Sequence, residues 1–279
     1  MAAASRAGTI TLTSTGGGPA ILGIAGREAT GTSPPPGAYA PAAMSLVDQA
    51  REHSWYHALE LPGVTTRGIF DMSQYVPRYG IPADLSGKRV LEIGTWDGFW
   101  AFELEKRGAD VVAIDLDDEE ALDWPPRRRT PNPDLVRGSG FRIAKELLGS
   151  DVERIVCSVY HAMPEDLGQF DLVFCGSVLL HLRDQMLALE RICNLVRPGG
   201  RFITAEEYEP VTDLVPFPMS RFRGNRDAAV VFHVPNRRGW RAMLFCAGFD
   251  RTEQIGTFTM KSNQGYGVRH VVHHAFKNA

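Results

Sequence analysis

From Met44 onward, short runs rich in Val, Ile and Leu alternate with longer segments whose apolar residues recur at helical spacing. The short runs predict strands at residues 89–93, 110–115, 154–158, 170–175 and 201–206. The longer segments predict helices at 97–107, 135–148 and 184–196. Strands and helices alternating at this spacing require right-handed crossovers, so we expect an α/β fold with a doubly wound parallel sheet.

The first 43 residues have a different pattern. Ala, Gly, Ser, Thr and Pro dominate residues 1–43, and Tyr39 is their single aromatic residue. Such a segment buries too little apolar surface to offset the entropy lost on ordering. We therefore expect residues 1–43 to form a disordered, low-complexity leader, and residues 44–279 to form one domain.

Composition narrows the class of protein and its partners. The chain has 279 residues, 44% of them hydrophobic, and a formal net charge of −3. No stretch reaches the ~20 apolar residues that a membrane-spanning helix needs, so no membrane partner is expected. Lys and Arg number 30 against 33 Asp and Glu, which disfavours nucleic acid as the main partner. The four cysteines form no CxxC pair and fall in apolar stretches, which predicts core residues in a reducing compartment and a cytoplasmic protein.

The turn after the first strand of the predicted sheet carries a candidate nucleoside site. Gly94 allows a sharp exit from this strand, and Gly98 opens the following helix. Asp115 ends the next strand, about 20 residues after Gly94, where a dinucleotide-binding fold places its ribose acid. Trp96 and Phe99 stand where a dinucleotide fingerprint requires glycine, and this disfavours NAD.

These segments carry a family resemblance. Val90 to Gly98 resembles the first motif of class I S-adenosylmethionine (SAM) methyltransferases, Phe170 to Cys175 their fourth strand, and Leu195 to Gly200 the turn before their fifth. The resemblance implies a Rossmann-like methyltransferase sheet with a C-terminal antiparallel hairpin, at 249–259 and 268–276, and SAM as the cofactor. It also implies a set of cofactor-binding residues: Glu92, Gly94, Thr95, Trp96, Gly98, Asp115, Ser158, Val159, Tyr160 and Ser177.

The resemblance extends to the tRNA wobble-uridine (5-oxyacetate/5-methoxyuridine) methyltransferase-like group. Segments similar to that group begin at Trp55-Tyr56-His57 and include 179–184, 214–216 and 232–235. Members that use carboxylated SAM hold its carboxylate with a Tyr and an Arg. Leu180 and Ala229 align with those positions, which favours ordinary SAM and methyl transfer unless Arg226 takes the Arg role through a shifted register.

Candidate chemistry lies after the fourth and fifth strands. His181 is a candidate base or acceptor ligand, and Glu206 is the candidate second catalytic residue. Residues 208–235 are the expected acceptor cap. Candidate substrate-binding residues come from this cap and from the N-terminal element: Trp55, His57, Arg221, Arg223 and His233. His270 and His273 have near-metal spacing but fall on opposite faces of a strand, so no metal site is expected.

Three functions stay open. The preferred one is methyl transfer from SAM to a polar small molecule, at oxygen. The alternatives are a tRNA wobble-uridine methyl- or carboxymethyltransferase and a SAM-binding protein without catalysis.

Overall fold

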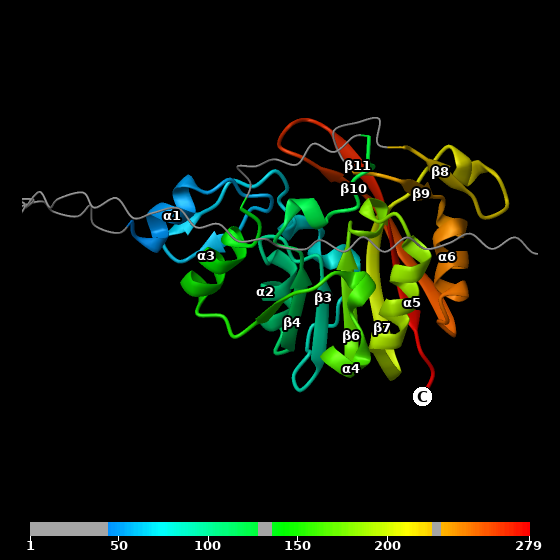
Figure 1. Ribbon diagram of the computed structural model, residues 1–279, viewed down its shortest axis with the longest axis horizontal. Helices are drawn as coiled ribbons and strands as arrows, with labels where there is room; N and C mark the ends of the chain where they lie inside the picture. Colours follow the sequence, from blue (N-terminus) through cyan, green and yellow to red (C-terminus); the bar gives the residue numbers. More distant parts are fainter. Residues whose placement is uncertain (1–43, 128–135, 225–229) are drawn as a thin grey trace, which may run out of the picture. The chain divides into compact units, whose positions relative to one another are not determined.

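A computed structural model describes residues 44–127, 136–224 and 230–279 of the chain. The predicted leader at 1–43 lies outside the described residues, as do Arg226 and Ala229. A seven-stranded sheet in the order β10-β11-β7-β6-β3-β4-β5 forms the centre (Figure 1). Its strands are β3 (Arg89–Ile93), β4 (Asp110–Asp115), β5 (Glu153–Val156), β6 (Phe170–Gly176), β7 (Val196–Glu207), β10 (Arg251–Lys261) and β11 (Gly267–Phe276).

Strand direction in this sheet confirms the predicted fold class. The five strands β3 to β7 are mutually parallel, and β11 pairs antiparallel with both β7 and β10. Because β11 runs the opposite way, its first residues lie at the same edge as the carboxyl ends of the parallel strands. The C-terminal hairpin that the resemblance implied is therefore present.

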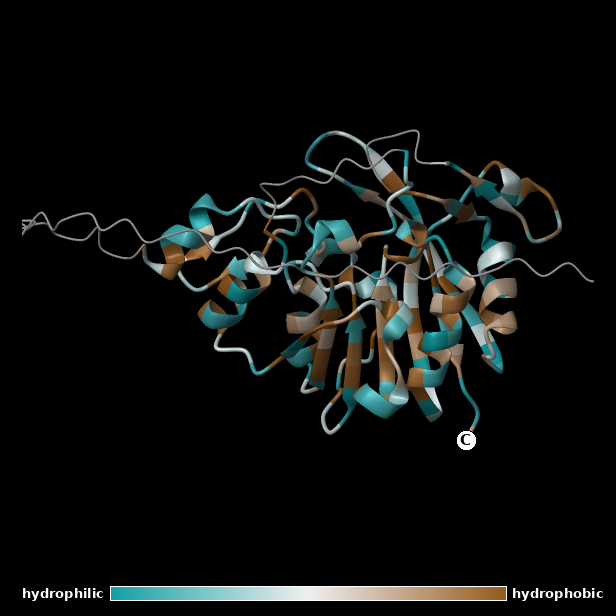
Figure 2. Cartoon of the chain, viewed as in Figure 1, coloured by the Kyte–Doolittle hydropathy of each residue, from teal (hydrophilic) through white to brown (hydrophobic). Residues whose placement is uncertain are grey.

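Helices cover both faces of the sheet. They are α1 (Leu46–Glu52), α2 (Phe99–Glu105), α3 (Ser139–Leu148), α4 (Pro164–Leu167), α5 (Gln185–Leu195) and α6 (Arg237–Cys246). One face buries Trp100 of α2 and Phe141 of α3, and the other buries Ile192 of α5 and Trp240 of α6. Figure 2 shows the apolar strands between these helices. Two cores result, one on each side of the sheet.

Small elements lie around the sheet. Two short antiparallel pairs are β1 (Glu60–Leu61) with β2 (Val64–Thr65) and β8 (Ser220–Phe222) with β9 (His233–Pro235). Short 3₁₀ helices are η1 (Ser73–Tyr79), η2 (Glu119–Ala121), η3 (Val159–His161), η4 (Leu179–His181) and η5 (Thr212–Leu214). In residues 44–127, 136–224 and 230–279, no helix is long and apolar enough to cross a membrane.

Several predicted details need correction. The helix expected at 135–148 begins at Ser139, after the left-handed Gly138, and β5 ends at Val156 instead of residue 158. Strand β7 begins at Val196 instead of residue 201, because Val196 already pairs with Phe170 of β6, ahead of a register shift. All four cysteines are free, but Cys246 is exposed and Cys157 is partly exposed, so only Cys175 and Cys193 are the expected core residues.

Helix α6 offers a test of the second core. Trp240 is 1% exposed, and its indole N–H donates to the Glu207 carbonyl at the end of β7 (2.9 Å). Replacing Trp240 with Ala should lower the free energy of unfolding by about 3–5 kcal/mol, because a large cavity remains. The matched control is Phe245→Ala on the same helix, where the side chain is 71% exposed and the change should stay within about 0.5 kcal/mol. Urea denaturation measures both, and equal losses would contradict this packing.

Candidate functional site

The turn between β3 and α2 is bound tightly to the neighbouring strand. Gly94 donates its N–H to the Ile114 carbonyl (2.8 Å), and the Trp96 N–H donates to Asp115 Oδ2 (2.7 Å). Gly94 has φ +78, and a Cβ there would lie 2.4 Å from Val178 Cγ2. This position therefore requires glycine on two counts, conformation and space. It also brings the turn after β6 directly against the turn after β3.

Asp115 lies in the predicted place at the end of β4, and an arginine contacts it. Its Oδ1 accepts from the Leu116 N–H (2.7 Å) and from Arg137 Nη2 (3.1 Å). Arg137 also donates to Glu119 and lies over the Trp96 ring at 4.3 Å. The side chains of Asp115 and Arg137 are 9% and 7% exposed, so this is a largely buried ion pair.

Asp97 attaches the N-terminal element to the same turn. Its Oδ2 accepts from two consecutive backbone donors, the N–H groups of Tyr56 (2.7 Å) and His57 (3.0 Å). Asp97 is 2% exposed, and burial raises the pKa of its carboxyl to about 6. The attachment places the Tyr56 ring 5.2 Å from the Trp96 ring.

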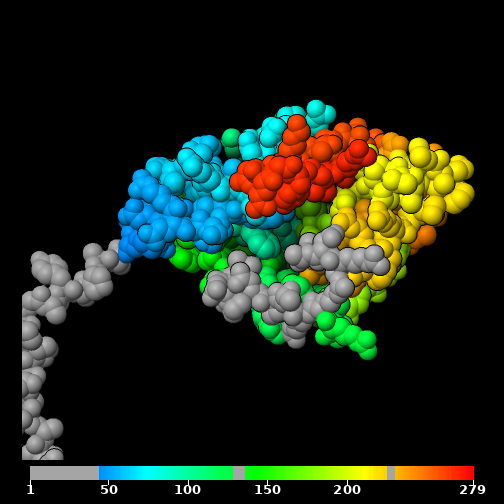
Figure 3. Space-filling model, turned by 90° about the horizontal axis from the view of Figure 1, so that it is seen from above, coloured from blue at the N-terminus to red at the C-terminus, as the bar shows by residue number. Residues whose placement is uncertain are grey.

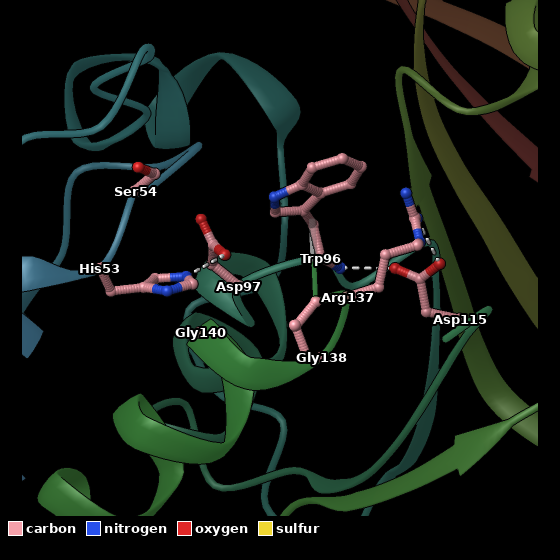
Figure 4. Close-up of a pocket in the computed structure, with 9 residues that line it drawn as sticks. His53, Ser54, Trp96, Asp97, Asp115, Arg137, Gly138 and Gly140 are labelled. Atoms are coloured by element: carbon pink, nitrogen blue, oxygen red, sulfur yellow. Dashed lines mark hydrogen bonds and ion pairs between the residues drawn. The ribbon is translucent and has the colours of Figure 1, made fainter. Parts of the chain in front are cut away.

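These groups line a small hollow (Figure 4). Asp97 and Asp115 lie on opposite sides of Trp96, and His53 Nε2 lies 4.0 Å from Asp97 Oδ1. The lining residues are His53, Ser54, Trp96, Asp97, Asp115, Val136, Arg137, Gly138 and Gly140. Trp96 and Asp115 were predicted at the site; Asp97 and Arg137 were missed. Asp97 had a local signal, as the acid inside the glycine turn, whereas Arg137 had none.

Glu206 stabilises the turn after β6 through a hydrogen bond to its buried carboxyl group. The Glu206 side chain is 1% exposed, and its Oε1 accepts from the Val178 N–H (3.2 Å). Burial raises the pKa of this carboxyl to about 8. Glu206 thus supports the turn that carries His181; its predicted catalytic role stays a prediction.

His181 is held by the predicted cap. Its Nδ1 lies within hydrogen-bond distance of the Val230 carbonyl, which can only accept, so Nδ1 carries the proton and Nε2 keeps a lone pair. Burial lowers the pKa of His181, and the nearby Arg137 charge adds to this effect. The ring is therefore neutral at neutral pH. Phe232 N–H also donates to the Leu180 carbonyl (3.1 Å), which binds the cap to the same turn.

The other predicted cofactor residues lie at this edge or directly below it. Ser158 caps η3 by accepting from the Tyr160 N–H, and Val159 is buried. Tyr160 donates its hydroxyl to Asp123 (2.6 Å) and accepts from the Asp184 N–H (3.0 Å). Glu92 and Thr95 are both 1% exposed, and Glu92 Oε2 and the Thr95 hydroxyl have no hydrogen-bond partner in the described part of the chain. Burial raises the pKa of Glu92 to about 8.

The predicted substrate-binding residues divide into two groups. Trp55 and His57 are 5% and 8% exposed, and Trp55 donates its indole N–H to the Ala50 carbonyl, so these two lie in the core of the N-terminal element. Arg221 and Arg223 on the insertion form ion pairs with Glu209 (2.9 Å) and Glu207 (3.0 Å). His233 packs against Phe222. Figure 3 shows the insertion (yellow) beside the β10–β11 hairpin (orange to red).

Comparison with known families identifies the central segment. Residues 91–204, from within β3 to within β7, match the family described as Methyltransferase domain. The chain contains a methyltransferase domain. Relatives that match part of the chain include methyltransferase str2 of Strobilurus tenacellus, with 33% identity over 43% of this chain and 36% of its own. A ubiquinone biosynthesis O-methyltransferase of Xanthomonas euvesicatoria pv. vesicatoria matches with 30% identity over 42% of each chain. The chain thus spans less than half the length of these relatives.

A tRNA U34 carboxymethyltransferase of Desulforapulum autotrophicum matches at 26% identity, over 59% of this chain and 45% of its own. The narrower resemblance to the wobble-uridine group therefore stays a prediction. Among solved structures, the N-terminal domain of EvdMO1, with S-adenosylhomocysteine and D-fucose present, has a TM-score of 0.58 and 17% identity, covering 83% of this chain and 94% of that one. This likeness confirms the Rossmann-like methyltransferase fold.

The methyltransferase domain confirms SAM as the predicted cofactor, and the site offers groups that fit it. The Asp115 carboxylate suits ribose hydroxyls, and Gly94 lets a ligand approach the backbone closely. Glu92 Oε2, buried near the end of β3 without a hydrogen-bond partner among the described residues, is left for a polar group of a ligand. The ribose hydroxyls would either bind the Asp115 carboxylate together with Arg137 or displace Arg137 from it.

Asp97 generates a pH-dependent prediction for the attachment of the N-terminal element. Its pKa rises from 3.8 to about 6 on folding, so the folded state binds the proton more tightly. The free energy of unfolding should therefore fall as pH rises from about 4 to about 6, by up to about 3 kcal/mol from this group. Asp97→Asn keeps one oxygen for both backbone donors and should lose this pH dependence.

Urea denaturation of both proteins between pH 4 and 7 measures the difference. Asp97→Ala is the companion variant, since it leaves two buried N–H groups without an acceptor. It should be about 2–4 kcal/mol less stable than Asp97→Asn. Parallel pH profiles for wild type and Asp97→Asn would contradict this account of Asp97.

Proposed function

We propose that this chain is a SAM-dependent methyltransferase that transfers a methyl group to a polar small molecule, at oxygen. One observation carries the proposal: within the methyltransferase domain, the Asp115 carboxylate and the glycine turn meet at the carboxyl edge of the sheet, with His181 on the neighbouring turn. Ligands of doubly wound sheets bind at this edge.

Bound SAM supplies an activated methyl group on its sulfonium. The protein's own contribution is alignment and exclusion of water. Asp115 holds the ribose end, and Tyr56, attached through Asp97, covers the turn beside Trp96. The support of Val178 by Glu206 fixes the distance between the cofactor turn and the turn carrying His181. Three carboxyl groups and two aromatic rings thus set one geometry.

His181 is the proposed base for the acceptor hydroxyl. Because the Val230 carbonyl holds the Nδ1 proton, Nε2 presents a lone pair that takes the hydroxyl proton as the oxygen attacks. The insertion at 208–235 then serves as the acceptor cap, with residues 225–229 outside the described part. Its arginines, Arg221 and Arg223, favour a polar or anionic acceptor, and their acidic partners leave only part of this charge for a ligand.

A tRNA substrate is the second candidate, and the wobble-uridine relative is the observation in its favour. In carboxylated-SAM users the position of Leu180 holds a tyrosine. Here Leu180 is 6% exposed and packs with Val231 and Val234, so it offers an apolar contact in place of a hydroxyl. This supports ordinary SAM.

Calorimetric titration with SAM, carboxylated SAM and NAD tests the cofactor. Wild type should bind SAM in preference to the other two, and Asp115→Ala should weaken SAM binding by about 10²-fold, because two charge-assisted hydrogen bonds are lost. Asp117→Ala is the matched control, since Asp117 is an exposed acid two residues away that pairs with Arg154. Preference for carboxylated SAM would favour the tRNA alternative, and an unchanged affinity of Asp115→Ala would remove Asp115 from the site.

His181 is tested by turnover of labelled SAM against a panel of hydroxylated compounds. With the acceptor so found, His181→Ala and His181→Asn should each lower kcat by about 10²-fold or more, with SAM affinity within about threefold of wild type. Asn can still donate to the Val230 carbonyl but lacks the lone pair at the Nε2 position. Full activity of His181→Asn would show that His181 only packs the cap.

Formation of S-adenosylhomocysteine with any acceptor would eliminate the non-catalytic alternative, and steeply salt-dependent tRNA binding would favour the tRNA enzyme.

A further inference from the structure

A serine and a histidine, 93 positions apart, meet at the carboxyl edge of the sheet. Ser177 directly follows β6, and His270 lies near the start of β11. Ser177 Oγ is 2.7 Å from His270 Nε2. His270 is 1% exposed and its ring stacks on Phe258, so its position is fixed by packing. The reaction described above uses neither the Ser177 hydroxyl nor His270.

The direction of this hydrogen bond follows from the other ring nitrogen. His270 Nδ1 is 3.0 Å from the Val268 carbonyl, which can only accept, so Nδ1 carries a proton. Burial lowers the pKa of His270 to about 4, which keeps the ring neutral at neutral pH. Nε2 therefore has no proton, and the Ser177 hydroxyl must donate to it.

Ser177 has an unusual backbone conformation at a central place. Among the described residues, Trp96 and Ser177 are the non-glycine residues with positive φ, and Ser177 has φ +59. Glycine adopts this conformation without strain, so what serine adds here is its hydroxyl. Its neighbour Val178 lies against Gly94, and His181 follows four residues later. Ser177 thus belongs to the turn that contacts the cofactor turn and carries the proposed base.

We propose that His270 holds the Ser177 hydroxyl so that Ser177 Oγ accepts a hydrogen bond from an O–H or N–H group of the methyl acceptor other than the hydroxyl that His181 deprotonates. This inference rests on the proposed function. With its own proton donated to His270, Ser177 Oγ presents only lone pairs. It recognises a donor and offers nothing to a carbonyl or an ether. Ser177, which the family resemblance placed among the cofactor-binding residues, is thus reassigned to the substrate, and His270 is a positioning residue.

The pair has a consequence for specificity. An acceptor that carries such a second O–H or N–H group satisfies Ser177, but an analogue with a methyl group in place of that hydrogen does not. A site built to hydrogen-bond a substrate hydroxyl discriminates strongly against analogues without it, because its buried polar group is left unpaired. Ser177 and His270 therefore favour an acceptor that has this second donor over an analogue that lacks it.

The hydrogen-bond arrangement can be tested without any acceptor. Nuclear magnetic resonance of protein labelled with ¹⁵N at histidine should show His270 protonated at Nδ1 alone, with the signal assigned by its loss in His270→Gln. Ser177→Ala should shift the Nε2 resonance. Calorimetry with S-adenosylhomocysteine should give the same affinity, within about threefold, for wild type and Ser177→Ala. A proton on Nε2, or a tenfold loss of S-adenosylhomocysteine affinity in Ser177→Ala, would overturn the proposal.

Kinetics with the acceptor found by the panel separates binding from general damage. Ser177→Ala and His270→Leu should each raise the acceptor KM about tenfold with kcat changed much less. His270→Gln places an amide oxygen near the position of Nε2 and should restore most of the affinity. Ser177→Gly, which relieves the positive φ but lacks the hydroxyl, should behave as Ser177→Ala.

His274→Gln is the control, since His274 is a buried histidine of the same strand that bonds to the Tyr79 carbonyl instead. It should leave the acceptor KM unchanged. An unchanged KM in Ser177→Ala, or no rescue by His270→Gln, would overturn the assignment. If wild type turned over no compound, the proposed function would fail, while the resonance and calorimetric results would still decide whether the pair is arranged as described.

Discussion

Two carboxylates that accept backbone N–H groups hold the site together. Asp115 accepts from Trp96, and Asp97, the residue after Trp96, accepts from Tyr56 and His57. Trp96 has φ +48, a conformation that costs free energy in a residue with a bulky side chain. The bond from its N–H to Asp115 offsets this cost. The N-terminal element, the cofactor turn and the end of β4 are therefore joined through three consecutive residues, Thr95 to Asp97.

On the other side of the site, a third buried carboxyl group, that of Glu206, also accepts a backbone N–H. Glu206 lies beneath the turn after β6 and accepts from Val178, while the cap contacts that turn from above through Val230 and Phe232. Gly94 lets Val178 approach the first turn closely. A conformational change in the cap would therefore move His181 directly. It would act on the cofactor turn through Val178, which belongs to the same turn as His181.

The sequence predicted the parallel strands well because strands buried on both faces are short apolar runs, and helical spacing separated them. It also placed Asp115 at the edge of the sheet, since strand ends and the 20-residue separation are local features. Arg137 was missed because its contacts with Asp115 and Trp96 depend on the path of the chain between β4 and α3. Trp55, a predicted substrate-binding residue, is buried in the N-terminal element, a burial that a single sequence position does not reveal, and its role stays a prediction.

The pairing of Ser177 with His270 shows most clearly that contacts between residues distant in the sequence could not be predicted. Both residues were noticed in the sequence, one as a cofactor contact and one as a poor metal ligand, but nothing local joins residues 93 apart. The antiparallel β11 brings them together, because only a strand of reversed direction places its first residues at the carboxyl edge. That reversal gives this edge a second neutral histidine. Of the two rings, His181 has its free lone pair available to a ligand, whereas His270 uses its lone pair to hold Ser177. Both arrangements present hydrogen-bond acceptors rather than donors. A site lined by such groups selects a molecule that carries hydrogen-bond donors.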